Sequence, residues 1–370
     1  MKKIKVLQFS VSNGKGGRTQ AILENWKFIN KEMFQFDFIA MKEPLEFQEE
    51  IEKAGGQVYY LSCTAEENPQ QFIEELERIF TNHYDIIHIH SACWKSFLVN
   101  ETARKFGIPK IVIHSHNTDV SKVEDVDLKK RMEQQHYQLR NILTPEMATD
   151  FWACSQAASR WLFADQIPKE QIKIVKDAID AKRFAYDSKT RERCRERLGI
   201  GDKFVIGHIG RFSYQKNQEY LVDLLYALKQ EQENVILLME GMGKTKNQVV
   251  DKVNALGLNK DVIFVENYEK IEELYQVMDV FVFPSRFEGF GRVLLEAQCS
   301  GLKCISSDQV PSDVKVTSNV EFMSLENFSE WVDWIKAVTP YNREDMSECI
   351  KESGYDIIKN VKYLERLYQQ

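Results

Sequence analysis

Two glutamates, Glu288 and Glu296, stand eight positions apart, with the glycine-rich turn Gly289-Phe290-Gly291 between them. The apolar run Val280–Phe283 precedes them, and apolar residues continue at helical spacing through Arg292–Cys299. This pattern predicts a buried strand, a loop that carries Glu288, and a helix that carries Glu296 about two turns from its start. Because open parallel sheets bind ligands at the carboxyl ends of their strands, we expect both carboxylates to face one ligand. Taken alone, they also fit an acid–base pair, or a helix cap and a surface residue.

Two cations stand five positions apart in a second segment, residues 210–217, which begins at Gly210 and ends at Asn217. The segment follows the apolar run 204–209 and precedes a stretch of helical periodicity, so Arg211 and Lys216 lie beside a predicted helix N-terminus. Such a pair suits a diphosphate, because a guanidinium binds two oxygens and an ammonium adds a point charge. A solvated basic turn is the alternative interpretation.

A glycine loop follows the first predicted strand, residues 4–9, and precedes a predicted helix over residues 19–29. Backbone amides at such a helix start can hold an anion or a sugar, so we expect Gly16 and Gly17 to contact donor or acceptor. The loop is not a dinucleotide fingerprint, because Thr19 stands where the third glycine belongs. The missing glycine argues against a Rossmann dehydrogenase.

Four histidines end two neighbouring predicted strands of the first half of the chain. His114 and His116 point to one face at the end of the strand 111–115, and His88 and His90 end the strand 86–90. Such a group could hold a metal ion, but no carboxylate is evident as a further ligand from the sequence pattern. Hydrogen bonding to the structure or to a substrate is the expected role, and no metal site is predicted.

Strand-like and helix-like segments alternate along the chain in two series, which predicts two doubly wound, Rossmann-like α/β domains with a cleft between them. The predicted boundaries are residues 1–184 for an acceptor-binding domain and residues 185–350 for a nucleotide-sugar-binding domain. Residues 351–370 are predicted to form a last helix that crosses back to the first domain. The charged segment 187–197 fits either a linker or a surface helix.

Composition excludes several classes of protein. With 370 residues and a net charge of −7, the chain is a globular protein of two domains and not a general nucleic-acid binder. Its seven cysteines form no C-x-x-C motif, which fits a reducing cytoplasm better than a disulfide framework. No stretch approaches the ~18 apolar residues of a membrane span, so any membrane contact would be peripheral, at the inner face.

The two motifs together resemble the large family 4 of retaining glycosyltransferases, which have the two-domain GT-B fold. The resemblance rests on Gly210-Arg211 with Lys216-Asn217, and on E-G-F-G-R-V-L-L-E from Glu288 to Glu296. It covers nearly the whole chain. Within the family the chain is most similar to bacterial capsular and exopolysaccharide transferases, through the segments 111–118, 306–311 and 353–357.

The resemblance implies a role for each matching residue. Arg211 and Lys216 would hold the donor diphosphate, and Glu288 would contact hydroxyls of the donor sugar. Glu296 would bind the ribose hydroxyls. Backbone groups of the remaining donor-site residues would contact the sugar, phosphate or base: Gly289, Phe290, Gly291, Gly210, Gly241, Asn267 and Tyr268.

The family also places a histidine against the donor sugar, for which His116 is the first choice and His114 the second. The chain departs from the family pattern at Asp177-Ala178, where an asparagine-glycine pair is usual before the interdomain linker. It departs again near Arg18 and Thr19, where the family often has an acidic residue, and this difference concerns the acceptor side.

The implied reaction moves a hexose or N-acetylhexosamine from a nucleotide sugar, UDP-linked by expectation, to a saccharide or lipid-linked acceptor of surface polysaccharide synthesis. It retains the anomeric configuration and needs no cofactor and no bound metal. Two alternatives remain open. One is a GT-B epimerase or hydrolase that acts on the nucleotide sugar itself, and the other is a non-catalytic partner subunit that only binds it.

Overall fold

The computed structural model describes the chain except for residues 1, 14–16, 42–43, 121–125, 232 and 339–340. The described residues form two α/β units. The first contains residues 1–177 and 357–370, and the second contains residues 178–356. The chain therefore leaves the first unit after Asp177 and returns to it at Ile357.

The first unit is built on a parallel sheet of seven strands in the order β3-β2-β1-β4-β5-β6-β7. The strand order reverses between β1 and β4, which places a topological switch point there. Its strands are β1 (Ile4–Val11), β2 (Phe34–Met41), β3 (Val58–Leu61), β4 (Ile86–Ser91), β5 (Lys110–Ser115), β6 (Asp150–Ala153) and β7 (Ile172–Ile174). Its α-helices are α1 (Gly17–Phe28), α2 (Gln48–Lys53), α3 (Pro69–Phe80), α4 (Leu98–Lys105), α5 (Val126–Ile142), α6 (Gln156–Leu162) and α15 (Ile357–Gln369).

The second unit is built on a parallel sheet of six strands in the order β10-β9-β8-β11-β12-β13, with its switch point between β8 and β11. Its strands are β8 (Phe204–Ile209), β9 (Val235–Glu240), β10 (Val262–Val265), β11 (Val280–Phe283), β12 (Lys303–Ser307) and β13 (Val320–Met323). Its α-helices are α7 (Ala181–Phe184), α8 (Ser188–Arg197), α9 (Gln218–Lys229), α10 (Lys246–Ala255), α11 (Ile271–Val277), α12 (Arg292–Cys299), α13 (Phe328–Ala337) and α14 (Ser347–Glu352).

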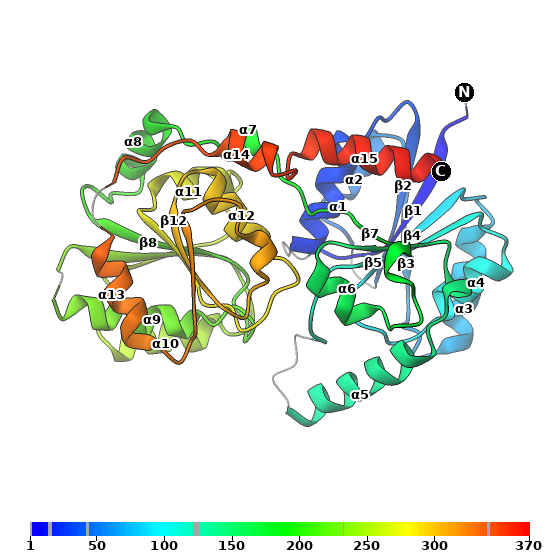
Figure 1. Ribbon diagram of the computed structural model, residues 1–370, viewed down its shortest axis with the longest axis horizontal. Coiled ribbons are helices and arrows are strands. Elements are labelled where there is room, and N and C mark those ends of the chain that lie inside the picture. The colour runs from blue at the N-terminus through cyan, green and yellow to red at the C-terminus, as the bar shows by residue number, and fades with distance from the viewer. Residues whose placement is uncertain (1, 14–16, 42–43, 121–125, 232, 339–340) are drawn as a thin grey trace. The chain divides into compact units, whose positions relative to one another are not determined.

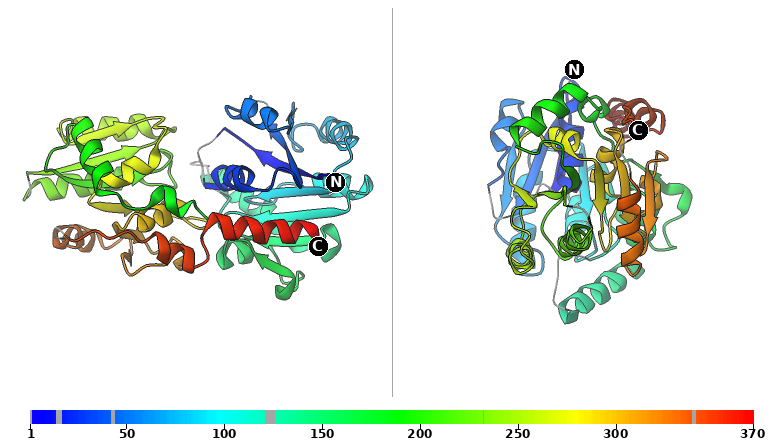
Figure 2. Two further views of the ribbon diagram at one scale, coloured as in Figure 1. Left: turned by 90° about the horizontal axis from the view of Figure 1, so that it is seen from above. Right: turned by 90° about the vertical axis from the view of Figure 1, so that its left-hand side faces the viewer.

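Helices cover both faces of each sheet, so the central strands are apolar on both sides. In the second unit α9, α10 and α13 lie on one face and α11 and α12 on the other (Figure 1). Figure 2 shows that the strands of each sheet run between helices on its two faces. The four residues of β11 are fully buried, as expected for a continuous apolar run in a parallel sheet. The two doubly wound units confirm the fold class predicted from alternation.

The last helix, α15, completes the first unit. It packs beside α1, and the ring of Tyr368 lies 5.9 Å from the rings of both Phe34 and Phe36. The Tyr368 hydroxyl lies 2.6 Å from Nδ1 of His88, 280 positions earlier. The apolar face of α15 therefore closes over strands at the middle of the sheet.

Several elements were not predicted. The segment 187–197, left open between linker and helix, is mostly helix α8, and the Asp187 side chain caps it by accepting from the amide of Thr190 at 2.6 Å. Short elements such as α6 and the four-residue strand β13 went unpredicted, because each is too short to show a clear hydrophobic period. In the described part of the chain, no helix combines the length and apolarity required to cross a membrane.

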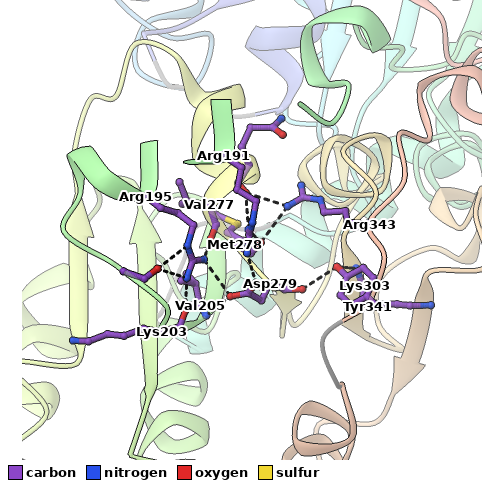
Figure 3. A network of polar contacts seen from close by, with 12 residues as sticks. Arg191, Arg195, Lys203, Val205, Val277, Met278, Asp279, Lys303, Tyr341 and Arg343 are labelled. Carbon is purple, nitrogen blue, oxygen red and sulfur yellow. Dashed lines mark hydrogen bonds and ion pairs between the residues drawn. The ribbon is translucent and has the colours of Figure 1, made fainter. Parts of the chain in front are cut away.

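Asp279 lies at the amino edge of the second sheet, opposite the strand ends that carry the predicted donor-site residues, and forms a network of polar contacts (Figure 3). Its carboxylate accepts from the amide of Val205 at 2.7 Å, from Arg191 at 2.5 Å and from Arg195 at 3.3 Å. Arg191 and Arg343 also donate to backbone carbonyls at the end of α11. These side chains line a cavity of about 1180 Å³, but their donors are already engaged with the fold.

We expect Asp279→Ala to lower the free energy of unfolding by about 2–3 kcal/mol, because two half-buried guanidinium groups and an amide lose their shared acceptor. Urea denaturation followed by circular dichroism measures the effect. Asp251→Ala is the matched control, since Asp251 is exposed on α10. Its free energy of unfolding should stay within about 0.5 kcal/mol of the wild-type value. Equal midpoints for the two variants would contradict the role of Asp279.

Candidate functional site

The carboxyl ends of β8 and β11 bring together the two predicted motifs. These strands are neighbours at the switch point of the second sheet, and each continues into one of the motif loops. Nζ of Lys216 lies 2.7 Å from Oε1 of Glu288 and 4.5 Å from the centre of the Phe283 ring. The two side chains are only 15% and 9% exposed. Residues 72 positions apart therefore form one nearly buried ion pair.

Hydrogen bonds fix the two loops to each other. The amide of Arg286 donates to the carbonyl of Gln215 at 2.8 Å, and the Gln215 side chain donates to the carbonyl of Phe287 at 3.0 Å. The Arg286 guanidinium donates to the carbonyl of Tyr214 at 2.7 Å. The loops thus form a single surface at the strand ends.

Arg211 is a half-buried cation on the same loop as Lys216. Burial lowers the pKa of its guanidinium. Among the residues that the structure describes, no carboxylate forms an ion pair with Arg211. A partly desolvated cation that has no carboxylate partner is suited to bind an anionic ligand.

Gly291 begins α12 with a backbone conformation that favours glycine. Its φ is +96°, and a Cβ at this position would lie 3.1 Å from Cγ1 of Val310. Phe290, just before it, is buried and stacks on Tyr355 with ring centres 5.1 Å apart. The turn from Gly289 to Gly291 is therefore fixed by packing, and it leads into the helix N-terminus beside the Lys216–Glu288 pair.

Glu296 lies within α12 and is buried in a polar network. Its Oε1 lies 3.1 Å from Nε of Arg292, and its Oε2 accepts from the hydroxyl of Tyr275 at 2.8 Å. Burial and the charge of Glu296 raise the pKa of Tyr275 well above its usual value, so the phenol remains a donor. Arg292 also donates to the carbonyl of Ala178 at 2.9 Å. The i, i+4 spacing of Arg292 and Glu296 could have been read from the sequence, but Tyr275 could not.

Glycines keep the ends of β8 and β9 close together. The amide of Gly210 donates to the carbonyl of Glu240 at 3.0 Å. Gly241 has a φ of +143°, and a Cβ on it would lie 2.2 Å from the carbonyl oxygen of Gly210. Backbone at these two positions is therefore free of side chains, as close approach of a ligand requires.

The predicted base-contacting residues follow β10. Asn267 is exposed and has a φ of +50°. The hydroxyl of Tyr268 donates to Oε2 of Glu273 at 3.0 Å, and the ring lies under Arg197. The side chain of Tyr268 is thus held within the fold, so any ligand contact at this position falls to the backbone.

Histidines form a connected network at the carboxyl edge of the first sheet. Nε2 of His88 lies 3.1 Å from Nδ1 of His114, and Nδ1 of His90 lies 2.9 Å from Nε2 of His116. Gln8 joins the two branches through His90 at 2.7 Å and Tyr368 at 3.4 Å. Burial lowers the pKa of His88, His90 and His114 well below the usual value, and the neighbouring histidines lower it further. The rings therefore hydrogen-bond as neutral imidazoles.

The structure adds two neighbours of His116 that the sequence did not indicate. Its Nδ1 lies 3.6 Å from Oδ1 of Asp177, and the cluster includes the thiol of Cys154. Gly17, predicted to contact donor or acceptor, is the exposed first residue of α1, and Gly16 lies outside the described residues. The roles predicted for His114, His116 and Gly17 stay predictions.

Comparison with known proteins gives a consistent result. The model of the family "Glycosyl transferases group 1" matches residues 190–327. EpsF of Bacillus subtilis strain 168, which is named as a glycosyltransferase, is 31% identical over 98% of this chain and 96% of its own. The capsular polysaccharide biosynthesis glycosyltransferase CapH of Staphylococcus aureus is 23% identical over 99% of this chain and 98% of its own.

Among solved structures, Anabaena HepE in complex with UDP and glucose aligns with a TM-score of 0.79 at 18% identity, over 100% of both chains. This likeness concerns the fold. The matched glycosyltransferase structures have the GT-B fold, and the two doubly wound units of this chain have it as well.

His208 lies directly beneath the Lys216 loop and predicts a pH effect. It is fully buried, its Nδ1 donates to the carbonyl of Val282 at 2.9 Å, and burial lowers its pKa to about 3. Between pH 6.5 and about 3 the unfolded chain therefore binds a proton that the folded chain does not. Acid favours unfolding over this range, by about 1.4 kcal/mol per pH unit from this group.

We expect His208→Gln to reduce the slope of the unfolding free energy against pH by about that amount between pH 6 and pH 4. Urea midpoints measured at half-unit steps of pH give the slope. His83→Asn, at an exposed turn position, should leave the slope as in the wild type. A His208→Gln slope that matches the wild type would refute the assignment.

Proposed function

The chain belongs to the group 1 glycosyltransferase family, and on that premise we propose that it transfers a hexose or N-acetylhexosamine from a UDP-sugar, with retention of configuration. The acceptor is a saccharide or a lipid-linked saccharide of surface polysaccharide synthesis, a proposal supported by the likeness to CapH, a glycosyltransferase of capsular polysaccharide biosynthesis. The choice of UDP is supported by the HepE complex, which holds UDP and glucose.

The observation that carries the proposal is the ion pair between Lys216 and Glu288, with Arg211 on the same loop as Lys216. Lys216 has three N–H donors, of which Glu288 engages one. The remaining donors can bind diphosphate oxygens while the carboxylate pair persists. Arg211 would add a bidentate contact to the same group, and the amides at the start of α12 would add further N–H donors.

This arrangement would stabilise the departing diphosphate. Negative charge grows on the diphosphate as the glycosidic bond breaks, and fixed cations in a poorly solvated site stabilise that charge strongly. The charge of Arg211 and Lys216 would supply what a divalent cation supplies elsewhere, so the proposed transfer step uses no bound metal. A diphosphate oxygen on the same face would accept the proton of the acceptor hydroxyl, which accounts for retention.

Two carboxylates would then bind hydroxyl groups at opposite ends of the donor. Glu288, oriented by Lys216, would bind hydroxyls of the sugar. Glu296, oriented by Arg292 and Tyr275, would bind the ribose hydroxyls. In both cases the existing partners fix the orientation before the ligand arrives, which lowers the entropy lost on binding.

Lys216→Ala should reduce kcat by at least about 100-fold, because the growing charge of the diphosphate loses a fixed cation. Transfer from UDP-hexoses to a saccharide acceptor, followed by product chromatography, measures the effect, and circular dichroism checks the fold. Lys229→Ala is the matched control: Lys229 ends the helix that follows Lys216 and forms its own ion pair, 2.9 Å from Asp261. A folded Lys216→Ala variant with wild-type turnover would overturn the diphosphate assignment.

Glu296→Ala should weaken UDP binding by about 10- to 100-fold, the loss expected for hydrogen bonds to a charged group. Isothermal titration calorimetry with UDP gives the dissociation constant. Glu330→Ala, at an exposed position on α13, serves as control. Unchanged affinity in Glu296→Ala would remove the ribose contact from the proposal.

Product analysis with and without acceptor separates this function from the alternatives. A transferase consumes the UDP-sugar only when acceptor is present. An epimerase or hydrolase changes the UDP-sugar in either case, and a binding subunit gives calorimetric UDP binding with no product.

A further inference from the structure

Three side chains with metal-binding chemistry meet at the carboxyl edge of the first sheet. His116 follows β5, Cys154 follows β6 and Asp177 follows β7, and these are three successive strands of the sheet. One ligand atom from each residue lies within 4.8 Å of the others. The topology accounts for this meeting, because neighbouring parallel strands end at one edge.

Hydrogen bonds fix the His116 ring with one nitrogen toward this cluster. The Oε1 atom of Gln8 can only accept, so Nε2 of His90, 2.7 Å away, carries the hydrogen. Nδ1 of His90 then accepts from Nε2–H of His116 at 2.9 Å. The nitrogen left with a lone pair is Nδ1 of His116, on the side of Asp177.

That lone pair is buried and faces another acceptor. Nδ1 of His116 has no hydrogen-bond partner within the described part of the chain, and the side chain is only 3% exposed. Oδ1 of Asp177 lies 3.6 Å away, too far for an N–H···O hydrogen bond. Two buried acceptors repel each other unless a positive charge lies between them. Two ligands of one tetrahedral Zn²⁺, each about 2.05 Å from the ion, would lie about 3.4 Å apart.

We propose that His116, Cys154 and Asp177 form a binding site for Zn²⁺, with a fourth position open to water. Imidazole nitrogen, thiolate and carboxylate are the donors that this ion takes in proteins. His90 would act as the outer partner that fixes the ligating ring through its second nitrogen. Cys154 is buried and in no disulfide, and its thiol would release one proton when the ion binds.

The carboxylate that the sequence did not place near the histidines is thus Asp177, 61 positions after His116. At this position the resembled family usually has asparagine, a neutral and weaker ligand. The ion would join Asp177, the last residue of the first unit, to the ends of β5 and β6. It would also occupy the nitrogen of His116 through which the ring could contact a sugar hydroxyl.

Cobalt(II) titration of the full chain after dialysis against EDTA tests the proposal without any substrate. We expect one equivalent of Co²⁺ to produce a thiolate-to-cobalt charge-transfer band and the visible bands of tetrahedral cobalt, and Zn²⁺ to abolish both. Cys154→Ser should remove the charge-transfer band. Asp177→Asn should weaken binding at least about 10-fold. Cys349→Ser, in the second unit, is the matched control and should keep the band.

Absence of the band in the wild type, or its survival in Cys154→Ser, would overturn the site. If Cys154→Ser does not fold, the titration of Asp177→Asn decides, because that change keeps shape and volume. UDP calorimetry on the same samples keeps this result separate from the proposed transfer function.

Discussion

The ion pair between Lys216 and Glu288 is the interaction on which the carboxyl edge of the second unit depends. Both side chains are nearly buried, and removing either one would leave the other as an uncompensated charge in a poorly solvated place. The two loops are therefore held together although they follow different strands. Strand order makes the pair possible, because β8 and β11 are neighbours only through the reversal at the switch point. A ligand at this edge meets an electrostatic surface that already exists before it binds.

Much of the fold could be predicted from the sequence, because its parallel strands are short continuous apolar runs between clear turns. β11 and α12 begin and end where the apolar pattern predicts. The elements that went unpredicted depend on distant contacts. β13 pairs only with β12, at the edge of the sheet, and its half-buried pattern has no strong period. The Asp279 network likewise joins α8 to a strand start more than 80 positions away.

The candidate site divides in the same way. Residue type and spacing locate Arg211, Lys216, Glu288 and Glu296, since these residues stand within recognisable strand–loop–helix segments. Spacing does not reveal what holds each of them. Tyr275 reaches Glu296 from another helix, and Asp177 reaches His116 from two strands further along the sheet. Such partners follow from the order of strands in space, which the one-dimensional pattern does not contain.

The place of α15 has a consequence for synthesis of the chain on the ribosome. Tyr368 contacts His88 and three aromatic residues of the first unit, so the centre of that unit is incomplete until α15 has emerged. The second unit, residues 178–356, is continuous and contains every strand of its own sheet. The N-terminal part of a chain usually folds first. Here the second unit can be complete before the first unit is. The second unit can therefore reach its native state while the first unit still lacks α15.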